Sequence, residues 1–333
     1  MGSTPAVSAL VDLETIGSVF QAANTIAVIG HIRPDADAIG SIAAVVSGAR
    51  FLGKEANGYI GQRTAIAENL LTIPGAAEIE IVEQFPKEPD LIVVVDCGDA
   101  GRVGRLGPEL EKYRHKVAVL DHHSSNSGFG AWNYIDVAAE STTVIVSQLL
   151  KYLKVPLTTA IAHQLYAGLV TDTGSFRWGS SYMHEMAISL MQYGIDIRQI
   201  ASDLISGVSA SDLNIIGEIL QKAEILPIVD YPIVFLTIKN SLYTQLSDSA
   251  IETIVDFGSS VQGTEIGVVL KEVKPARWSV SLRSSSCDIA QLAEIMGGGG
   301  HRAAAAFIAT GTAQEVRTRL QMGLENWLTG DLQ

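Results

Sequence analysis

The chain has 333 residues, of which 47% are apolar and 18% charged, so it is long enough to bury two hydrophobic cores. Its net charge of −13 excludes a broad positive surface for gripping long nucleic acid, so any phosphate-bearing ligand must be held locally. Cys97 and Cys287 lack the spacing of a disulfide framework or a thiolate zinc site. There is no secretion-signal pattern and no run of about 18 apolar residues, so we expect a soluble, cytoplasmic protein without a membrane partner.

Four short apolar runs in the first half are typical of buried strands: Thr25–Gly30, Ala56–Ile60, Leu91–Val95 and Val117–Leu120. Helical periodicity marks five stretches between and after them: Ala38–Leu52, Ala65–Leu71, Ser141–Leu153, Thr158–Thr171 and Met183–Tyr193. This order predicts an α/β domain with a parallel sheet and helices on both faces. In such sheets ligands gather at the carboxyl ends of the strands.

The pattern of apolar and polar residues changes between about residues 195 and 215. We expect a catalytic domain over residues 1–195, a linker region over 196–215 and a smaller α/β domain over 216–333. The second domain is predicted to hold a mixed sheet and two helices, from the segments Ile233–Ile238, Glu265–Val273, Trp278–Arg283, Ile289–Met296 and Ala313–Leu328. Its second and third strands are predicted to form a hairpin, because Lys274–Arg277 has the composition of a turn.

The first predicted strand is followed by a turn that holds one imidazole and two carboxylates, those of His31, Asp35 and Asp37. Carboxylates two residues apart in a loop can face neighbouring cations, and Pro34 stiffens the turn. Either aspartate is also a suitable helix N-cap. This turn alone therefore leaves a metal site and a helix start equally open.

The next two strands also end in polar groups: Asp96 follows Leu91–Val95, and His122 and His123 follow Val117–Leu120. Asp172 comes at the end of an apolar helix. A single acid after a strand is a common turn former, but three successive strand ends of this kind indicate a shared site.

Six of these residues offer imidazole or carboxylate ligands and no sulfur: His31, Asp35, Asp37, Asp96, His122 and Asp172. Such a set suits two divalent ions, with Mn²⁺ the first choice and Mg²⁺, Fe²⁺ or Zn²⁺ as alternatives. Two ions about 3.5–4 Å apart activate water and neutralise a phosphoryl group, which predicts hydrolysis of a phosphate ester.

These motifs resemble those of the DHH phosphoesterase superfamily. The similar segments are His31-x-x-x-Asp35-x-Asp37, Asp96-x-Gly-Asp99, Asp121-His122-His123 and Thr171-Asp172-Thr173-Gly174. The stretch Gly297–Ala305 is similar to the glycine–histidine signature of the associated DHHA1 substrate domain. Within the superfamily the chain looks most like the bifunctional oligoribonucleases and 3′-phosphoadenosine 5′-phosphate phosphatases.

The resemblance implies a role for each residue of the site. His31, Asp35 and Asp172 would hold one ion, Asp37 and His122 the other, and Asp96 would bridge them. His123 and Asp96 would be the catalytic groups, with His123 facing the substrate phosphate in a cleft between the domains. The residues implied to contact the nucleotide are Arg283, Gly298, Gly299, Gly300 and His301. Taken alone, the glycines are equally consistent with a flexible hinge.

Two residues depart from the family pattern, since Ala36 and Ala306 stand where glycines are usual. Because alanine reaches positive φ less easily than glycine, Ala36 puts the geometry of the first metal turn in question.

The resemblance implies hydrolysis of oligoribonucleotides of about two to five nucleotides, and of 3′-phosphoadenosine 5′-phosphate to AMP, without affinity for long nucleic acid. Two alternatives stay open. One is a phosphodiesterase for cyclic or linear dinucleotides such as c-di-AMP and pApA, and the other is a nucleotide-binding module without catalysis. Pyrophosphate is disfavoured as a substrate because the second domain does not resemble that of the related pyrophosphatases. A homodimer is compatible with the sequence but not required by it.

Overall fold

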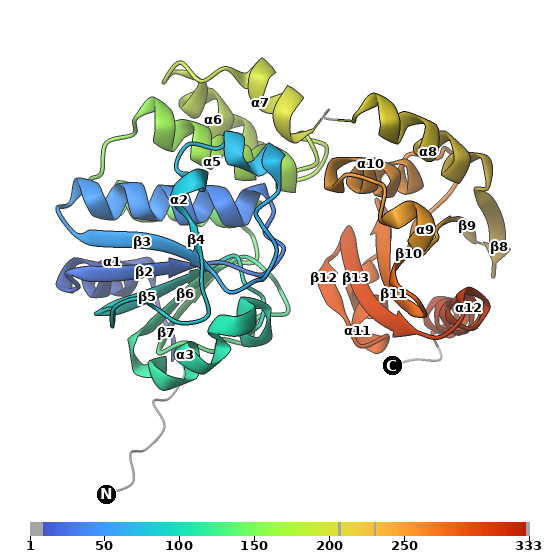
Figure 1. Ribbon diagram of the computed structural model, residues 1–333, viewed down its shortest axis with the longest axis horizontal. Helices are drawn as coiled ribbons and strands as arrows, with labels where there is room; N and C mark the ends of the chain where they lie inside the picture. Colours follow the sequence, from blue (N-terminus) through green and yellow to red (C-terminus); the bar gives the residue numbers. More distant parts are fainter. Residues whose placement is uncertain (1–8, 206–207, 230, 331–333) are drawn as a thin grey trace, which may run out of the picture. The chain divides into compact units, whose positions relative to one another are not determined.

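The computed structural model describes residues 9–205, 208–229 and 231–330, and the chain divides into two compact units, Met1–Ile205 and Ser206–Gln333 (Figure 1). The division lies within the 196–215 stretch that the sequence suggests as a linker. Much of that stretch is helical, because α7 (Ile197–Leu204) ends the first unit and α8 (Ala210–Gln221) begins the second. Residues 206 and 207 of the stretch lie outside the described residues. Among the described helices, none is both long and apolar enough to cross a membrane.

The first unit is built on a seven-stranded sheet, whose described strands all pair in parallel in the order β1-β7-β6-β5-β2-β3-β4. The strands are β1 (Ala9–Leu10), β2 (Thr25–Ile29), β3 (Glu55–Ile60), β4 (Glu80–Ile81), β5 (Leu91–Val95), β6 (Val117–Asp121) and β7 (Trp132–Ile135). In the register of the sheet Ile29 pairs with Val94, and Val94 pairs with Val119. The carboxyl ends of β2, β5 and β6 therefore lie side by side.

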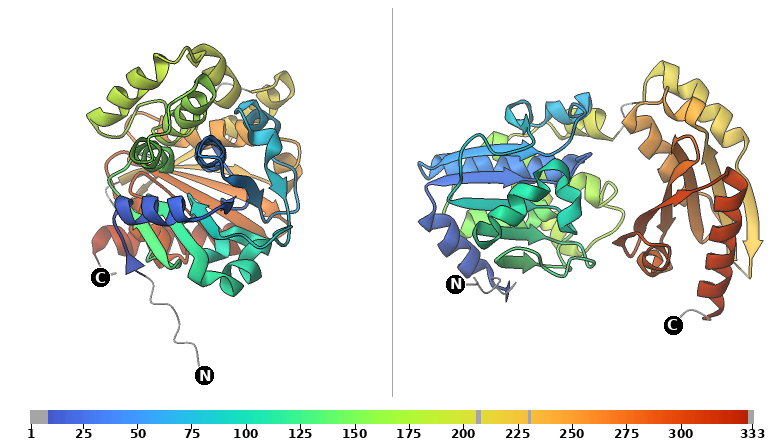
Figure 2. Two further views of the ribbon diagram at one scale, coloured as in Figure 1. Left: turned by 90° about the vertical axis from the view of Figure 1, so that its left-hand side faces the viewer. Right: turned by 60° about the horizontal axis from the view of Figure 1, so that its bottom comes forward.

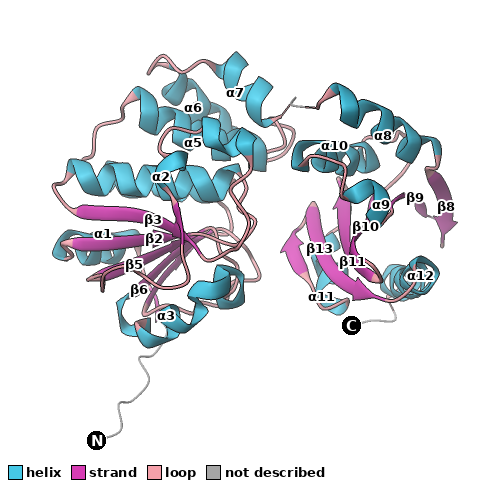
Figure 3. Ribbon diagram, in the orientation of Figure 1, coloured by secondary structure: helices cyan, strands magenta, loops and turns pink. Residues whose placement is uncertain are grey.

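Side chains that alternate along β2 enter two different cores, one on each face of this sheet. Ile26 and Val28 pack on one face with α1 (Leu13–Ala22), α2 (Ala36–Phe51), α4 (Thr142–Tyr152), α5 (Thr159–Asp172) and α6 (Ser181–Met191). Ala27 and Ile29 pack on the other face with the short helices η3 (Ala100–Leu106) and α3 (Gly107–Lys112). The views in Figures 2 and 3 show helices on both sides of the strands. The predicted parallel sheet with two covered faces is thus confirmed.

One predicted helix of this unit is wrong in type. The stretch Ala65–Leu71 was expected to be α-helical, whereas the structure has the 3₁₀ helix η1 (Glu68–Thr72) there. Pro74 and Gly75 follow directly, and a five-residue segment is too short to sustain an α-helix. Two further single turns, η2 (Ala76–Glu78) and η4 (Arg114–Lys116), lead into strands.

The second unit holds a six-stranded mixed sheet in the order β12-β13-β11-β10-β9-β8, in which only β9 and β10 pair in parallel. Its elements are β8 (Glu224–Ile228), β9 (Tyr231–Ile238), α9 (Asn240–Tyr243), α10 (Asp248–Ser259), β10 (Ile266–Lys274), β11 (Arg277–Ser284), α11 (Ile289–Ile295), β12 (Gly299–His301), β13 (Ala304–Thr310) and α12 (Ala313–Thr329). Helices α8 and α10 pack on one face over β9 and β10, and α11 and α12 pack on the other. The expected hairpin is present as β10 and β11.

Candidate metal centre

The candidate ligands that follow the predicted strands lie close together in the first unit. His31 follows β2, Asp96 follows β5, and His122 follows β6, and these three strands are neighbours. The groups whose ligand atoms lie within 4.8 Å of one another include His31, Asp35 and Asp96, and also Asp37, Asp96 and His122. We call the six residues of the predicted ligand set the metal cluster: His31, Asp35, Asp37, Asp96, His122 and Asp172.

Asp35 is both the N-cap of a helix and a candidate metal ligand, the two roles that the sequence leaves open. Its Oδ1 caps helix α2 by accepting hydrogen bonds from the backbone N–H groups of Asp37 and Ala38, at 3.1 and 3.0 Å. Its Oδ2 lies 3.6 Å from Nε2 of His31. One carboxylate oxygen thus starts the helix while the other faces the cluster.

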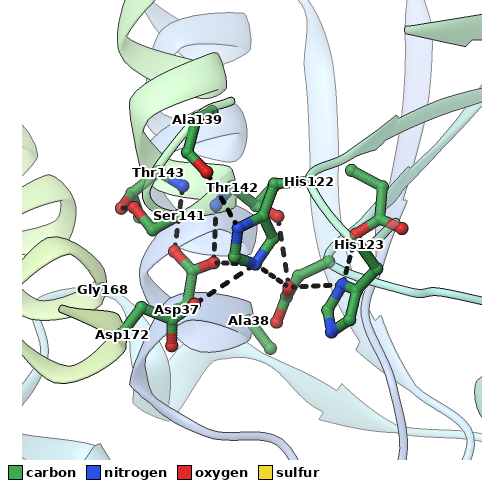
Figure 4. A network of polar contacts seen from close by, with 12 residues as sticks. Asp37, Ala38, His122, His123, Ala139, Ser141, Thr142, Thr143, Gly168 and Asp172 are labelled. Carbon is green, nitrogen blue, oxygen red and sulfur yellow. Dashed lines mark hydrogen bonds and ion pairs between the residues drawn. The ribbon is translucent and has the colours of Figure 1, made fainter. Parts of the chain in front are cut away.

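Asp37 is fully buried and is held by the start of another helix. Its two oxygens accept hydrogen bonds from the backbone N–H groups of Thr142 (2.6 Å) and Thr143 (2.9 Å) at the N-terminus of α4 (Figure 4). These donors and the positive end of the helix dipole stabilise a carboxylate there. Gly168 of α5 leaves the necessary room, because a Cβ at this position would lie 2.4 Å from Asp37 Oδ1.

Asp96 is at the centre of the cluster. Its Oδ2 lies 3.3 Å from His31 Nε2, and its Oδ1 lies 3.6 Å from His122 Nε2. Oδ1 also accepts a hydrogen bond of 3.1 Å from the hydroxyl of Thr142. The backbone of Asp96 has φ +53°, a left-handed conformation that is uncommon outside glycine and that often marks functional positions.

The two histidines of the cluster present the same ring atom to it. His31 Nδ1 lies 3.0 Å from the carbonyl oxygen of Ile32, and His122 Nδ1 lies 3.2 Å from that of Ala139. Because a carbonyl only accepts, Nδ1 carries the proton in both rings. With one proton fixed on Nδ1, Nε2 is the ring atom that each histidine offers to a cation, which is the arrangement that metal-binding histidines adopt.

These residues fit a pair of divalent cations. His31 Nε2 is buried and makes no hydrogen bond with another described residue, although two carboxylate oxygens lie within 3.6 Å. The ligand atoms therefore converge on shared points instead of bonding one another. Two buried carboxylates, the half-buried Asp172 and the exposed Asp35 face only two imidazoles, so cations would balance the charge of the cluster.

The pKa values of the metal-free cluster also reflect the excess of carboxylates over imidazoles. Burial lowers the pKa of His31, as does the nearby charge of Arg102, but the carboxylates of Asp35 and Asp96 outweigh both and raise this pKa to about 10. Burial and the charge of Asp96 raise the pKa of Asp37 well above its ordinary value. Without a cation, the cluster thus holds protons that an exposed group would release.

Asp172 ends helix α5 and joins the cluster through His122. Its Oδ2 lies 3.2 Å from His122 Nε2, and its side chain is 22% exposed. The resemblance groups Asp172 with His31 and Asp35, whereas this contact joins it to the histidine of the other group. Which ion Asp172 would bind therefore stays a prediction.

His123 is supported by two residues that the sequence did not single out. Its Nδ1 lies 2.8 Å from Oδ1 of Asp121, and Oδ2 of Asp121 accepts a 2.7 Å hydrogen bond from the side chain of Asn126. Asp121 is fully buried, so this pairing fixes the imidazole. Asp121 belongs to the quoted Asp-His-His motif, but nothing in the sequence distinguished it from a turn former.

The candidate substrate contacts of the second unit lie on one sheet. Arg283 of β11 pairs in register with Ala304 of β13, and Ala304 pairs with His301 of β12. Arg283 lies 3.6 Å from Glu252 and is 20% exposed. The structure thus brings Arg283 and His301 to the same sheet, on the two strands that flank β13.

The glycine stretch is more regular than a loop or hinge. Gly299 and Gly300 belong to strand β12, and a Cβ at Gly298 would lie 2.1 Å from the carbonyl oxygen of Ala306. The N–H of Gly298 donates to the carbonyl of Ala293 at 2.7 Å, so it is not available to an anion. Close packing on β13 therefore explains Gly298 without a ligand.

The two departures from the family pattern cause no backbone conflict. Ala36 is the first residue of α2 and is buried, and it is not among the residues with positive φ. Ala306 lies in the regular strand β13 opposite Ser281. Alanine is therefore compatible with the local backbone at both positions.

Comparisons with known proteins agree with the motifs. Residues 25–169 match the model of the DHH family, N-terminal domain, and residues 230–329 match that of the DHHA1 domain. The bifunctional oligoribonuclease and PAP phosphatase NrnA of Thermus thermophilus is 28% identical over 280 residues, which cover 83% of this chain and 81% of the relative. The protein of the same name from Mycoplasma genitalium is 24% identical over 310 residues, covering 90% and 94%.

Solved structures share the fold. An exopolyphosphatase-related protein from Bacteroides fragilis has a TM-score of 0.83 at 21% identity, covering 95% of this chain and 96% of that one. RecJ from Thermus thermophilus, solved in complex with Mn²⁺, has a TM-score of 0.54 at 14% identity, covering 95% of this chain and 54% of RecJ. At these identities the likeness concerns the fold alone.

Proposed function

The chain belongs to the DHH family and carries its DHHA1 domain, and we propose that this metal-dependent hydrolase of phosphate esters acts on short oligoribonucleotides and on 3′-phosphoadenosine 5′-phosphate. The products would be mononucleotides and AMP. The names of two relatives, which cover most of this chain, support this choice of substrates. The net charge of −13 supports substrates of about two to five nucleotides over long strands.

The proposal rests on Asp96, which belongs to both ligand groups that the residues of the metal cluster form. One group adds His31 and Asp35, and the other adds Asp37 and His122. Two divalent ions held by these groups would activate a water molecule and neutralise the charge of a phosphoryl group. Mn²⁺ suits the mixed imidazole and carboxylate ligands, and RecJ, which shares the fold, was solved with it.

The protein's own residues prepare the site before any substrate arrives. Thr142 and Thr143 orient Asp37, and the hydroxyl of Thr142 also orients Asp96. Such bonds hold ligands in one geometry, so that little reorganisation is needed during the reaction. Asp121 holds His123 through Nδ1, and we assign His123 to the substrate phosphate or to the proton of the leaving oxygen.

The second unit is proposed to bind the nucleotide rather than to take part in the chemistry. Arg283 offers a planar pair of donors that suits a phosphate or a base edge. His301, from the glycine stretch, lies two strands away in the same sheet. If the roles are divided in this way, hydrolysis of a substrate without a nucleoside depends little on the residues of the second unit.

The test is a panel of substrates offered to protein that was stripped with a chelator and reloaded with Mn²⁺. It contains 5′-phosphorylated dinucleotides, 3′-phosphoadenosine 5′-phosphate, c-di-AMP, pyrophosphate and a 24-nucleotide RNA. We expect mononucleotides and AMP from the first two, and none of these products from stripped protein. Preferential cleavage of c-di-AMP, or processive decay of the long RNA, would overturn the substrate assignment. Binding of nucleotides without turnover at any metal would favour the non-catalytic alternative.

A further inference from the structure

Arg102 is a half-buried arginine of η3 whose guanidinium makes no hydrogen bond or ion pair with another residue of the described chain. Two other partly buried arginines are paired, Arg105 with Glu83 and Arg317 with Glu224. Arg114 also has a buried Nε without a hydrogen-bond partner among the described residues, but it lies in η4, before the amino end of β6 and so at the opposite edge of the sheet from the metal cluster. The sequence has 36 acidic and 23 basic residues, so Arg102 is not unpaired for lack of acids. A desolvated, unpaired guanidinium is unfavourable, which suggests that an anion from outside the chain completes it.

The segment that carries Arg102 packs against the first metal turn. η3 begins four residues after Asp96, which follows β5, and Asp99 caps its start. The carbonyl of Arg102 accepts a 2.8 Å hydrogen bond from the N–H of Ile32, the residue after His31. Gly104 permits this contact, because a Cβ there would lie 2.3 Å from a side-chain carbon of Ile32. The backbone of Arg102 is therefore fixed beside the metal cluster.

A second arginine lies next to Ile32 in the same turn. Arg33 is exposed, and among the described residues its guanidinium also has no acidic partner. Its backbone has φ +54°, and its N–H donates to the buried side chain of Gln62 at 2.7 Å. This bond holds a conformation that is costly for a residue other than glycine. Two arginines without partners thus stand on two segments that are hydrogen-bonded to each other.

A substrate with two phosphates needs more than the metal cluster can offer. The ions neutralise the phosphate that is hydrolysed, but a second phosphate beside so many carboxylates would be repelled unless it met its own cation. A guanidinium binds a terminal phosphate through charge-assisted, paired hydrogen bonds. The backbone that carries Arg102 is already fixed beside the first metal turn by its hydrogen bond with Ile32.

We propose that Arg102, with Arg33 beside it, forms a subsite of the first unit for a second, terminal phosphate of the substrate. The subsite selects esters that carry a phosphate monoester besides the phosphate that is cleaved, such as 5′-phosphorylated dinucleotides and 3′-phosphoadenosine 5′-phosphate. This inference rests on the proposed function and refines its substrate class. Arg102 binds this group and takes no part in bond cleavage.

The experiment compares two esters that share the scissile group and differ only in the second phosphate. These are 3′-phosphoadenosine 5′-phosphate and adenosine 3′-monophosphate, measured with the Mn²⁺-loaded full chain. We expect Arg102→Ala to lower the ratio of the two kcat/KM values by about 10- to 100-fold, as for loss of a charge-assisted contact. Arg102→Lys keeps the charge and should recover part of the ratio. Arg105→Ala, on the same helix but paired with Glu83, is the matched control and should leave the ratio unchanged.

The proposal is overturned if Arg102→Ala lowers both kcat/KM values equally, since that is the result of a structural role. If the wild-type protein cleaves neither nucleotide, the proposed function fails but the subsite is still tested. In that case pyrophosphate and inorganic phosphate are compared as inhibitors of bis(p-nitrophenyl) phosphate hydrolysis. The subsite predicts that Arg102→Ala weakens inhibition by pyrophosphate about tenfold more than inhibition by phosphate. Equal changes of the two inhibition constants contradict it.

Discussion

In the first unit four of the six candidate ligands are buried and several are fixed by hydrogen bonds, whereas in the second the candidate substrate contacts lie on a partly open sheet. Asp37 and Asp96 are at most 1% exposed, and each accepts a hydrogen bond from Thr142. By contrast, Ala306 of β13 is exposed, and Arg283 is 20% exposed and meets Glu252 only at 3.6 Å.

The difference shows how the two kinds of task shape a site. Metal chemistry needs ligands in one geometry, and the strands and helices of the first unit hold the ligands in place by hydrogen bonds and close packing. Nucleotide binding tolerates adjustment, and a surface that holds a longer substrate gains from side chains that can still move.

Asp96→Asn should reduce kcat by about 10³-fold or more, because both ligand groups lose their common carboxylate. This is at least the effect of removing one oxyanion-hole donor in other enzymes. Initial rates on 3′-phosphoadenosine 5′-phosphate at saturating Mn²⁺ measure it. Asp99→Asn is the control, since Asp99 lies three residues away and caps η3 by accepting from the N–H of Gly101. A loss no greater than in the control variant would refute a central role for Asp96.

Metal-free protein should lose stability as the pH rises from about 6.5 to about 10. The pKa of His31 is about 10 in the folded state and 6.5 ordinarily, so the folded chain binds the imidazole proton more tightly than the unfolded chain does. The resulting stabilisation of the folded state is present in full below pH 6.5. That contribution is lost as the pH passes the folded value, and amounts to a few kcal/mol at about 1.4 kcal/mol per pKa unit. Calorimetry in chelator against Mn²⁺ measures it. A metal-free melting temperature that rises over this range would contradict the account.

Arg283→Ala should raise KM for 3′-phosphoadenosine 5′-phosphate by about 10- to 100-fold and leave metal content unchanged. Hydrolysis of bis(p-nitrophenyl) phosphate, which has no nucleoside, should be nearly unaffected. Arg277→Ala, at the exposed other end of β11, is the matched control. If Arg283→Ala impairs the generic ester as severely as the nucleotide, the assignment of binding to the second unit is wrong.

Gly168→Ala should destabilise the first unit by about 1–3 kcal/mol, the usual cost of overpacking. The added Cβ would lie 2.4 Å from Asp37 Oδ1 and 2.6 Å from a side-chain carbon of Thr143, both on well-fixed groups. Gly107→Ala is the control in the same unit, because a Cβ there meets nothing within 4 Å. Denaturant unfolding compares the two, and equal stabilities would show that the cluster is less rigid than described.

The sequence was sufficient to predict the parallel sheet, because β2, β5 and β6 are continuous apolar runs followed by polar groups. It did not predict β7, β12 or β13, since Trp132–Ile135 lacks a regular pattern and the glycine- and alanine-rich stretch of 299–310 has no apolar alternation. Strand pairing, not local preference, decides these elements.

Within the site, the ligand types could be predicted because each is an acid or a histidine in the segment after a strand, at the start of the helix that follows it, or at the end of a helix. The supporting residues could not. Thr142 acts through a contact with a residue distant in the sequence, and Gly168 through space that only the fold defines. Asp121 contacts His123, only two residues away, but the sequence does not show that its buried side chain turns toward this imidazole. Arg102 was missed for the same reason, since only the structure shows which arginines have a partner.

The central claim is that two ions share Asp96, and the stoichiometry of Mn²⁺ binding tests it most directly. Chelator-stripped chain is dialysed to equilibrium against increasing Mn²⁺, and bound metal is measured by atomic emission for the wild type and for Asp96→Asn. The account predicts two ions per chain in the wild type, with both sites weakened together in the variant while Asp99→Asn retains them. A wild type that saturates at one ion, or an Asp96→Asn variant that binds two ions with unchanged affinity, would contradict the shared-carboxylate site.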